Sequence, residues 1–215
     1  MPNSTDSPPT GGRRAQAARN DAVILAAARA VFLDDPKAPI AAVAERAGVG
    51  ISALYRRYAG KEDLLRKLCD DGLRRFVAEA EEAADEPDDW AAFAGFLERV
   101  VDADVHSLTV HLAGTFTPTE EMGRAAVRAN ELVDGLVGRA HRSGRLRPDV
   151  VAQDVGLLLE GCAAIRVPDP GRTRELRRRH LAVLLAGLAA SGPPLPGPPP
   201  AAGEFDWRWR STAER

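Results

Sequence analysis

Two short helical segments separated by a glycine-containing turn constrain the fold of this chain more than any other feature. The first segment spans residues 40–47, and Gly48 can end it because glycine adopts the left-handed conformation without steric cost. The second segment spans residues 51–58. A helix, a turn of about three residues and a second helix are the pattern of a helix-turn-helix unit.

The second segment divides into two faces at 100° per residue. Ile51, Leu54 and Tyr58 fall on one side, and we expect them to pack inward. The other side is small, polar and basic, which suits base edges and phosphates in a DNA major groove. It carries Ser52, Ala53, Arg56 and Arg57, with Tyr55 at the rim.

The rest of the chain predicts an all-α fold. Aromatic residues make up only 5% of the 215 residues and alanine is abundant, which favours close-packed helices over sheets. An acidic, proline-containing break at 81–89 separates the N-terminal part of the chain, called the head below, from the C-terminal part, called the body. Further along, Thr119 can cap a helix. About nine helices are predicted, at 18–32, 40–47, 51–58, 62–80, 90–114 (one or two helices, interrupted near 103–107), 120–143, 148–167 and 172–191.

Charge is distributed unevenly along the chain. Residues 1–68 carry 11 Lys and Arg against 7 Asp and Glu, whereas residues 69–215 carry 18 against 24. A basic head followed by an acidic body is typical of a protein whose head binds a polyanion. The asymmetry is small, so it supports DNA binding only together with the helix-turn-helix pattern.

Several classes of protein are disfavoured. Cys69 and Cys162 are too far apart for a CxxC motif, which indicates a reducing, cytoplasmic setting. No apolar stretch approaches the length of a membrane span, and the N-terminus lacks a signal-peptide core. Four histidines and two distant cysteines predict no metal site and no cofactor. An enzyme with an apolar pocket is the remaining catalytic alternative, but no nucleophile or phosphate-loop motif supports it.

The order "AGV…LYRRY…K" at residues 47–61 resembles the motif of the TetR family of bacterial transcriptional regulators. The preceding "ILAAARAVF" is similar to the first helix of that family. The resemblance covers about residues 19–68, and it implies a three-helix DNA-binding head followed by a helical body. The implied regulator is most simply a repressor that leaves a palindromic operator when a small apolar ligand binds.

The resemblance also implies which residues meet double-stranded DNA. Pro39 and Gly50 stand where the family often has Ser or Thr, and Ala53 stands where it often has Thr. Arg57 replaces a common aromatic residue or His, so it is the strongest candidate for a base contact, with guanine as its target. The full set of expected DNA contacts is Lys37, Gly50, Ile51, Ser52, Ala53, Tyr55, Arg56, Arg57, Tyr58 and Lys61.

The implied body binds a ligand and forms a homodimer. The helices at about 150–165 and 172–190 are apolar around much of their circumference, which fits burial on more than one side. Glu160 and Arg166 fit either pocket selectivity or a pair at the dimer rim. The candidate pocket residues, each of which would also suit an ordinary core, are Trp90, Phe93, Phe96, Leu108, Leu112, Phe116, Met122, Val127, Leu158 and Cys162.

Four regions follow from this interpretation. Residues 1–14 form a disordered arm, 15–61 the DNA-binding domain, 62–191 the ligand-binding and dimerisation domain, and 192–215 a Pro-rich tail. The tail contains "GPPLPGPPP", which leaves open a regulator controlled by a protein partner instead of a small molecule. Exposed tryptophans are costly in water. Trp207 and Trp209 near the end of the tail therefore fit docking on the body or at the mouth of the pocket.

Overall fold

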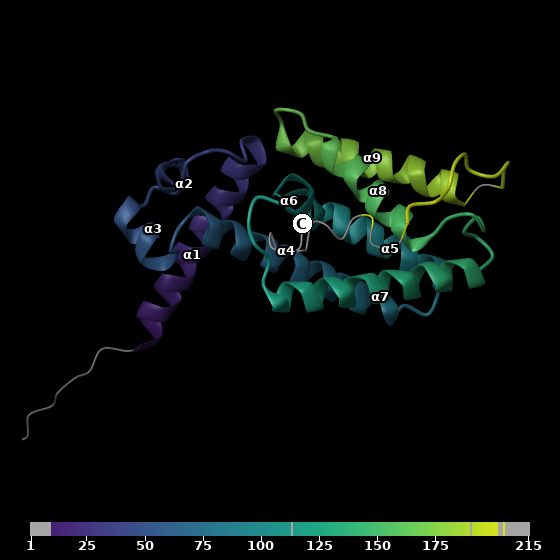
Figure 1. The fold of residues 1–215 in the computed structure, drawn as a ribbon, viewed down its shortest axis with the longest axis horizontal. Helices are drawn as coiled ribbons and strands as arrows, with labels where there is room; N and C mark the ends of the chain where they lie inside the picture. The colour runs from purple at the N-terminus through teal and green to yellow at the C-terminus, as the bar shows by residue number, and fades with distance from the viewer. Residues whose placement is uncertain (1–9, 113, 190, 202–203, 205–215) are drawn as a thin grey trace, which may run out of the picture. The chain divides into compact units, whose positions relative to one another are not determined.

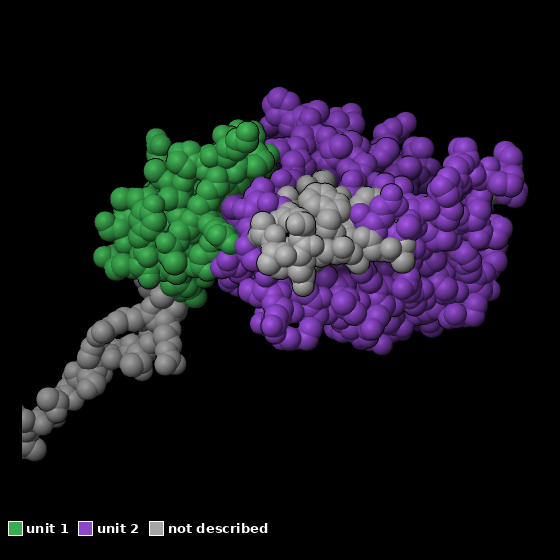
Figure 2. All heavy atoms as spheres, viewed as in Figure 1, with its two compact units in different colours: residues 1–64 green, residues 65–215 purple. Residues whose placement is uncertain are grey.

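The computed structural model describes residues 10–112, 114–189, 191–201 and 204, and these residues form nine α-helices and no strand (Figure 1). The all-α fold predicted from the sequence is therefore confirmed. The chain divides into two compact units, residues 1–64 and 65–215, drawn in green and purple in Figure 2. Every helix in the described part of the chain is too short or too polar to cross a bilayer.

Unit 1 consists of α1 (Thr10–Asp34), α2 (Ile40–Ala47), α3 (Ile51–Arg57) and the first turn of α4 (Lys61–Ala84). Helix α2 contacts both α1 and α3. Each element contributes at least one buried side chain to the core of the unit. The buried residues are Ile24, Ala27, Ala28, Phe32, Ala38, Ile40, Val43, Ala44, Leu54, Tyr58 and Leu64.

The turn between α2 and α3 depends on glycine. Gly48 has φ 65° and ψ 30°, the left-handed conformation predicted for it, and its N–H bonds to the carbonyl of Glu45. Gly50 precedes α3 in an extended conformation and supplies no side-chain cap. The backbone therefore makes the turn without help from a Ser or Thr hydroxyl.

Unit 2 contains the rest of α4 together with five helices. These are α5 (Asp89–Asp102), α6 (Val105–Leu112), α7 (Glu120–Arg142), α8 (Ala152–Ala164) and α9 (Pro170–Leu188). Helix α5 contacts α6, α7, α8 and α9, so it lies at the centre of the unit. The side chain of Asp88 caps α5 and that of Thr119 caps α7, the latter as the sequence predicted.

Helix α1 begins earlier than predicted. Residues 10–14 are helical, whereas the sequence pattern predicts a disordered arm there; residues 1–9 lie outside the described part of the chain. The Arg, Ala and Gln residues that follow Gly12 have high helix propensity, and they extend the helix across the glycines. The predicted arm is therefore wrong for residues 10–14.

Helix α4 ends later than predicted, at Ala84. Arg139 of α7 donates from Nη1 to the carbonyl of Ala84 at 2.7 Å and from Nη2 to that of Glu86. Arg128 of α7 bonds to Glu81 at 3.3 Å. A cation at the carboxyl end of a helix is favourable, so these long-range contacts stabilise a helix end that its own acidic residues disfavour.

An ion pair between a buried arginine and a half-buried aspartate joins α9 to the α5–α6 connection. Arg177 is 4% exposed, and its Nη1 lies 2.5 Å from Oδ1 of Asp104. The same carboxylate accepts a bond from Ser107, and Asp104 has φ 52°, a conformation rare outside glycine. Arg177 also donates to the carbonyls of Ala163 (3.2 Å) and Ile165 (3.0 Å), which end α8. One guanidinium therefore fixes the ends of three helices.

Helix α8 begins at Ala152 rather than near Pro148, because residues 147–149 bind the start of the tail. Arg147 pairs with Asp149 at 2.5 Å and donates to the carbonyl of Pro193 at 2.7 Å. The backbone N–H of Leu195 donates to Asp149 at 2.7 Å. The predicted tail therefore starts as an extended segment that is fastened at two points; Trp207 and Trp209 lie outside the described residues.

The attachment of the tail through Asp149 is expected to weaken at acid pH. The bond from Arg147, followed by that from the Leu195 N–H, lowers the pKa of Asp149 to about 2. The pKa of an unfolded aspartate is about 3.9. The stabilisation that the Asp149 carboxylate contributes is therefore complete above about pH 4 and is lost as the pH falls through 2. Asp149→Asn should release Leu195 at neutral pH, measured as faster hydrogen exchange of its amide, while the amide of Gly197 serves as the internal control. Unchanged exchange at Leu195 would contradict this account.

Candidate nucleic-acid interface

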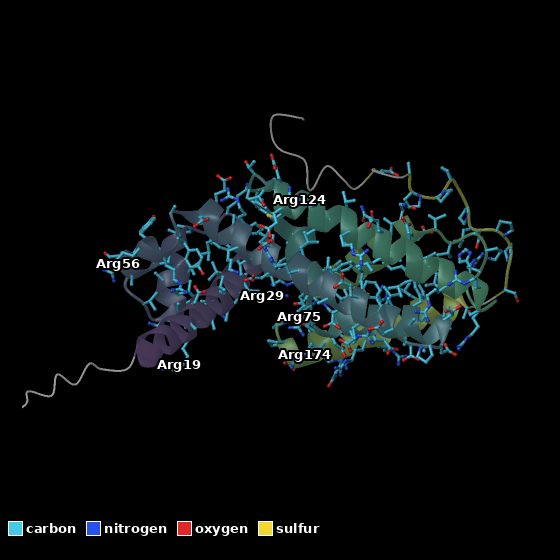
Figure 3. All side chains as sticks on the ribbon, turned by 90° about the horizontal axis from the view of Figure 1, so that it is seen from below. Arg19, Arg29, Arg56, Arg75, Arg124 and Arg174 are labelled. Atoms are coloured by element: carbon cyan, nitrogen blue, oxygen red, sulfur yellow. The ribbon has the colours of Figure 1, made fainter. Side chains whose placement is uncertain are left out.

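Helix α3 presents a polar and basic face on the surface of unit 1. Ser52, Arg56 and Arg57 are exposed, and Tyr55 is 52% exposed. Leu54 and Tyr58 are buried beneath them, as predicted. Figure 3 shows Arg56 extending away from the unit into solvent. This combination of exposed cationic, hydroxyl and phenol groups on one short helix suits contacts with phosphates and base edges.

Ile51 does not pack inward as its position in the helical repeat predicted. Its side chain is 40% exposed, because it occupies the first turn of α3, where the helix emerges from the turn at Gly50. Ala53 is only half-buried, so it lies at the edge of the exposed face. An exposed isoleucine beside polar groups can contact a thymine methyl group.

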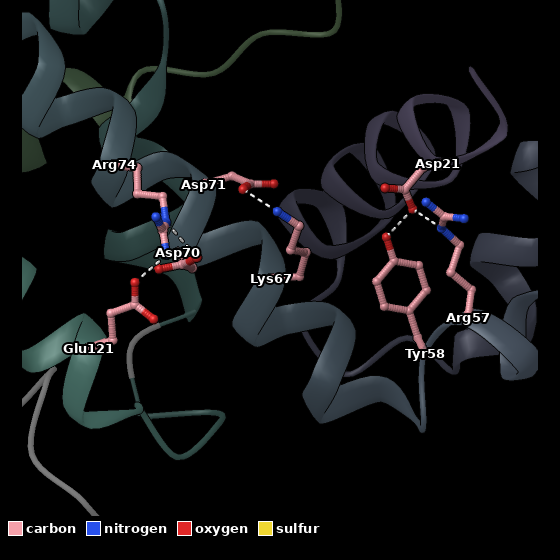
Figure 4. Close-up of polar contacts among 8 residues, drawn as sticks. All are labelled: Asp21, Arg57, Tyr58, Lys67, Asp70, Asp71, Arg74 and Glu121. Carbon is pink, nitrogen blue, oxygen red and sulfur yellow. Dashed lines mark hydrogen bonds and ion pairs between the residues drawn. The ribbon is translucent and has the colours of Figure 1, made fainter. Parts of the chain in front are cut away.

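Arg57 does not extend freely into solvent. Its Nε donates to Oδ1 of Asp21 on α1, and the Tyr58 hydroxyl donates to the same oxygen at 2.5 Å (Figure 4). The bond to Asp21 raises the pKa of Arg57, so the guanidinium stays charged. Burial, followed by the bond to Asp21, raises the pKa of Tyr58, so the phenol keeps the proton that it donates. The local sequence pattern does not reveal Asp21 as a partner of Arg57, because 36 residues separate the two.

Lys61 is directed into unit 1. Its Nζ donates to the carbonyls of Pro36 (2.8 Å) and Ala38 (2.7 Å) in the connection between α1 and α2. The same ammonium lies 5.2 Å from the centroid of the Phe32 ring. Two of its three protons are therefore used for hydrogen bonds within unit 1.

We expect Lys61→Met to destabilise unit 1 by roughly 1–3 kcal/mol. The substitution removes a charged donor from two carbonyls and a cation from an aromatic face. Chemical denaturation would measure the loss. Lys67→Met is the matched control, because Lys67 pairs with Asp71 one turn along α4, with both side chains about two-fifths exposed. A Lys61 variant as stable as this control would show that its contacts contribute nothing.

The remaining DNA candidates make few contacts of their own. The side chain of Lys37 is exposed, and its backbone N–H bonds to Asp35 at 2.8 Å. Pro39 and Gly50 precede α2 and α3 without a capping hydroxyl. The absence of hydroxyls at these two positions leaves the first N–H groups of both helices uncapped by the residue in front of them.

The predicted pocket residues of unit 2 lie mostly in its interior. Trp90, Phe93, Phe96 and Cys162 belong to one apolar cluster built around α5, with Leu158 packed against it. Burial raises the pKa of the Cys162 thiol. Val127 is 59% exposed on α7, so it is a surface residue and not a liner of an interior pocket. The other buried candidates are Leu108, Leu112, Phe116 and Met122.

Two described cavities in unit 2 are lined by other residues. One, of about 300 Å³, lies between α5 and α9 beside Glu98, Asp102 and Arg178. The other, of about 410 Å³, is lined by residues 144–149 and by residues around the start of the tail. Both are lined largely by charged and small residues, which is not the lining expected for an apolar ligand.

Two family models match the sequence. A model described as "Bacterial regulatory proteins, tetR family" matches residues 24–68, which include α2, α3 and the start of α4. A model described as "Transcriptional regulator SbtR-like, C-terminal domain" matches residues 87–190, which include α5 to α9. No curated protein matches the chain.

Solved structures with the same fold are numerous. PfmR, a TetR family transcriptional regulator from Thermus thermophilus, is 21% identical with a TM-score of 0.60, over 78% of this chain and 99% of that one. A TetR regulatory protein from Mycobacterium vanbaalenii is 25% identical with a TM-score of 0.54, over 82% and 99%. LfrR from Mycobacterium smegmatis, solved in complex with proflavine, is 24% identical with a TM-score of 0.51, over 78% and 96%.

The two family models together cover the helix-turn-helix and the helical body, and α3 of the helix-turn-helix is a short helix with two exposed arginines. TetR-family regulators are transcription factors and not enzymes. The chain belongs to the TetR family, and it is a DNA-binding transcriptional regulator.

Proposed function

We propose that this regulator is a homodimeric repressor that leaves a palindromic operator when a small apolar ligand binds its body. DNA contact is assigned to residues 15–61, and ligand binding and dimerisation to residues 62–191. The observation that carries the proposal is the exposed face of α3, where Ser52, Tyr55 and Arg56 surround a buried Leu54. The helix offers hydroxyl, phenol and guanidinium groups in the space of seven residues, which suits a major groove.

The other proposed DNA contacts have distinct roles. Arg57 makes the base contact, with guanine as its target. Lys61 offers its remaining N–H to a phosphate, and Lys37 adds an exposed charge near the start of α2. Four further residues either fix the position of α3 or pack against the surface of the DNA. They are Gly50, Ile51, Ala53 and Tyr58.

A gel shift tests operator recognition. The purified protein is mixed with DNA from around its own gene at two salt concentrations, beside Arg57→Ala and Tyr55→Phe. We expect a shift that survives competitor DNA in the wild type and is lost in Arg57→Ala. Arg124→Ala is the matched control, because Arg124 is an exposed arginine in unit 2. Equal binding to all sequences that collapses with salt would leave only phosphate attraction and contradict the proposal.

The proposed dimer uses α8 and α9. Leu157 of α8 is 47% exposed and Val183 of α9 is 63% exposed. Ala164, Ala182 and Ala186 are also exposed on these helices, and small side chains permit close approach of a second copy. Such a face is costly in water, and a two-fold interface would bury it on both copies at once.

Charge placed on this face should prevent dimerisation. We expect the double variant Leu157→Asp/Val183→Asp to sediment as a monomer and to lose high-affinity operator binding, because one head alone contacts one half-site. The control is Val127→Asp, which adds one such charge at a valine of α7 that is about as exposed as Val183. Dimers that persist in the double variant would place the interface elsewhere.

The proposed ligand site lies among α5 to α8. Its lining residues are the half-buried Leu158 and the buried Trp90, Phe93, Phe96, Leu108, Leu112, Phe116, Met122 and Cys162. LfrR is similar in fold and was solved with proflavine, which makes planar aromatic compounds a reasonable first set of probes. A ligand releases DNA only through different affinities for the two states. Compounds that raise the thermal stability of the protein without changing operator affinity would contradict the proposed switch.

A further inference from the structure

We propose that Asp21 is a positioning residue that fixes the guanidinium of Arg57 for reading one base, and that Asp21 thereby sets sequence specificity. The inference rests on the proposed operator recognition and names a residue outside the helix-turn-helix itself. Asp21 lies on α1, and its Oδ1 accepts hydrogen bonds from both Arg57 and Tyr58 at the carboxyl end of α3.

The geometry divides the guanidinium into a held side and a free side. Nε of Arg57 donates to Asp21, whereas the terminal Nη nitrogens make no hydrogen bond with the described part of the protein. Figure 4 shows both terminal nitrogens on the far side of the group from the arginine stem. A guanidinium that is held at Nε keeps its two-pronged edge for O6 and N7 of a guanine.

Tyr58 holds the carboxylate in turn. Its ring is buried, and its hydroxyl donates to the same Oδ1 that accepts from Arg57. A phenylalanine would fill the same space without making this bond. Tyr58, Asp21 and Arg57 therefore form a short chain of bonds that runs from the core of unit 1 to the exposed face of α3, and this chain limits the rotamers open to Arg57.

Because Asp21 is charged, the two effects of removing it change DNA affinity in opposite directions. A carboxylate near DNA repels phosphates, so its removal alone should strengthen binding to every sequence. Loss of positioning should instead weaken binding to the operator, since a mobile arginine must be ordered before it reads a base. A structural role without positioning would lower the active fraction for all DNA equally and leave the ratio of specific to unrelated binding unchanged.

The experiment measures dissociation constants of the full chain by fluorescence anisotropy on three kinds of duplex. These are the best operator from selection of bound genomic fragments, the same operator with its guanines replaced one at a time, and an unrelated duplex. The variants are Asp21→Asn, Tyr58→Phe, Arg57→Ala and the double variant Asp21→Asn/Arg57→Ala. Glu45→Gln is the matched control, because it removes one exposed negative charge from α2 in the same unit.

We expect Asp21→Asn to weaken operator binding about tenfold and to leave binding to the unrelated duplex unchanged or tighter. Replacing the guanine read by Arg57 should cost the wild type about tenfold, and should cost Asp21→Asn much less. In the Arg57→Ala background Asp21→Asn should cause no further loss, and Tyr58→Phe should show the Asp21→Asn pattern more weakly.

The contrary outcomes separate the two proposals. If the wild type prefers its operator and Asp21→Asn keeps the same ratio of operator to unrelated binding, the inference fails and operator recognition stands. If Asp21→Asn behaves like Glu45→Gln, only charge is involved and the inference also fails. If the wild type binds all duplexes alike, both the proposed operator recognition and the inference are overturned.

Discussion

Leu54→Ala is expected to unfold unit 1 at a much lower denaturant concentration and to abolish operator binding near the growth temperature. Leu54 is fully buried in the middle of α3, and its removal leaves a cavity under the exposed face. Leucine-to-alanine changes in cores cost about 2–5 kcal/mol. A unit of about 64 residues has little stability to spare, since small domains bury a smaller share of their surface.

Two comparison variants make this expectation specific to packing. Leu54→Met keeps the volume and should cost less than about 1.5 kcal/mol. Val23→Ala truncates a half-exposed residue of α1 and should change stability by no more than about 0.5 kcal/mol. Circular dichroism during urea unfolding and operator binding would be measured on all three. A Leu54→Ala protein that unfolds with the wild type would show that α3 does not depend on this contact.

Arg177→Met is expected to be the most destabilising single change in unit 2, at roughly 3–5 kcal/mol. The methionine leaves the Asp104 carboxylate without its cation and removes two donors from the carbonyls that end α8. The cost arises chiefly from the groups left behind, because a half-broken buried pair is worse than either an intact pair or none.

A double variant tests that reasoning directly. Arg177→Met/Asp104→Asn should recover part of the loss, because asparagine removes the stranded charge and tolerates the left-handed conformation at φ 52°. Arg179→Met is the surface control, with an expected change within about 0.5 kcal/mol. The readout is the free energy of unfolding from urea titration. Equal losses in the single and double variants would mean that the stranded carboxylate is not the cause.

Local signals allowed much of the fold to be predicted from the sequence. Gly48 takes the left-handed conformation expected of it, and Thr119 caps α7 through its hydroxyl. The interruption between α5 and α6 falls at residues 103–104, within the predicted interval. These features depend on residues within one or two turns of each other, so their pattern is visible in a single sequence.

The features that could not be predicted depend on partners far along the chain. The end of α4 is extended by arginines of α7, and the start of α8 is delayed by a pair that binds the tail. In the candidate interface, helical periodicity identified the exposed face of α3, but it placed Ile51 inside. It gave no sign that Asp21 would hold Arg57, since a charge on α1 reads as solvated surface until the two helices are packed.

The boundary between the two units falls inside α4, between Leu64 and Leu65, and both leucines are buried. A protease therefore finds no exposed linker at this point, and the units would not be released as separate fragments by a single cut there. Recombination between relatives meets the same restriction. A crossover that joins this head to another body must fall within a helix and preserve its phase, because one extra residue would rotate the following buried leucines by about 100°. Heads and bodies of this kind can therefore be exchanged only between proteins whose α4 helices have the same length.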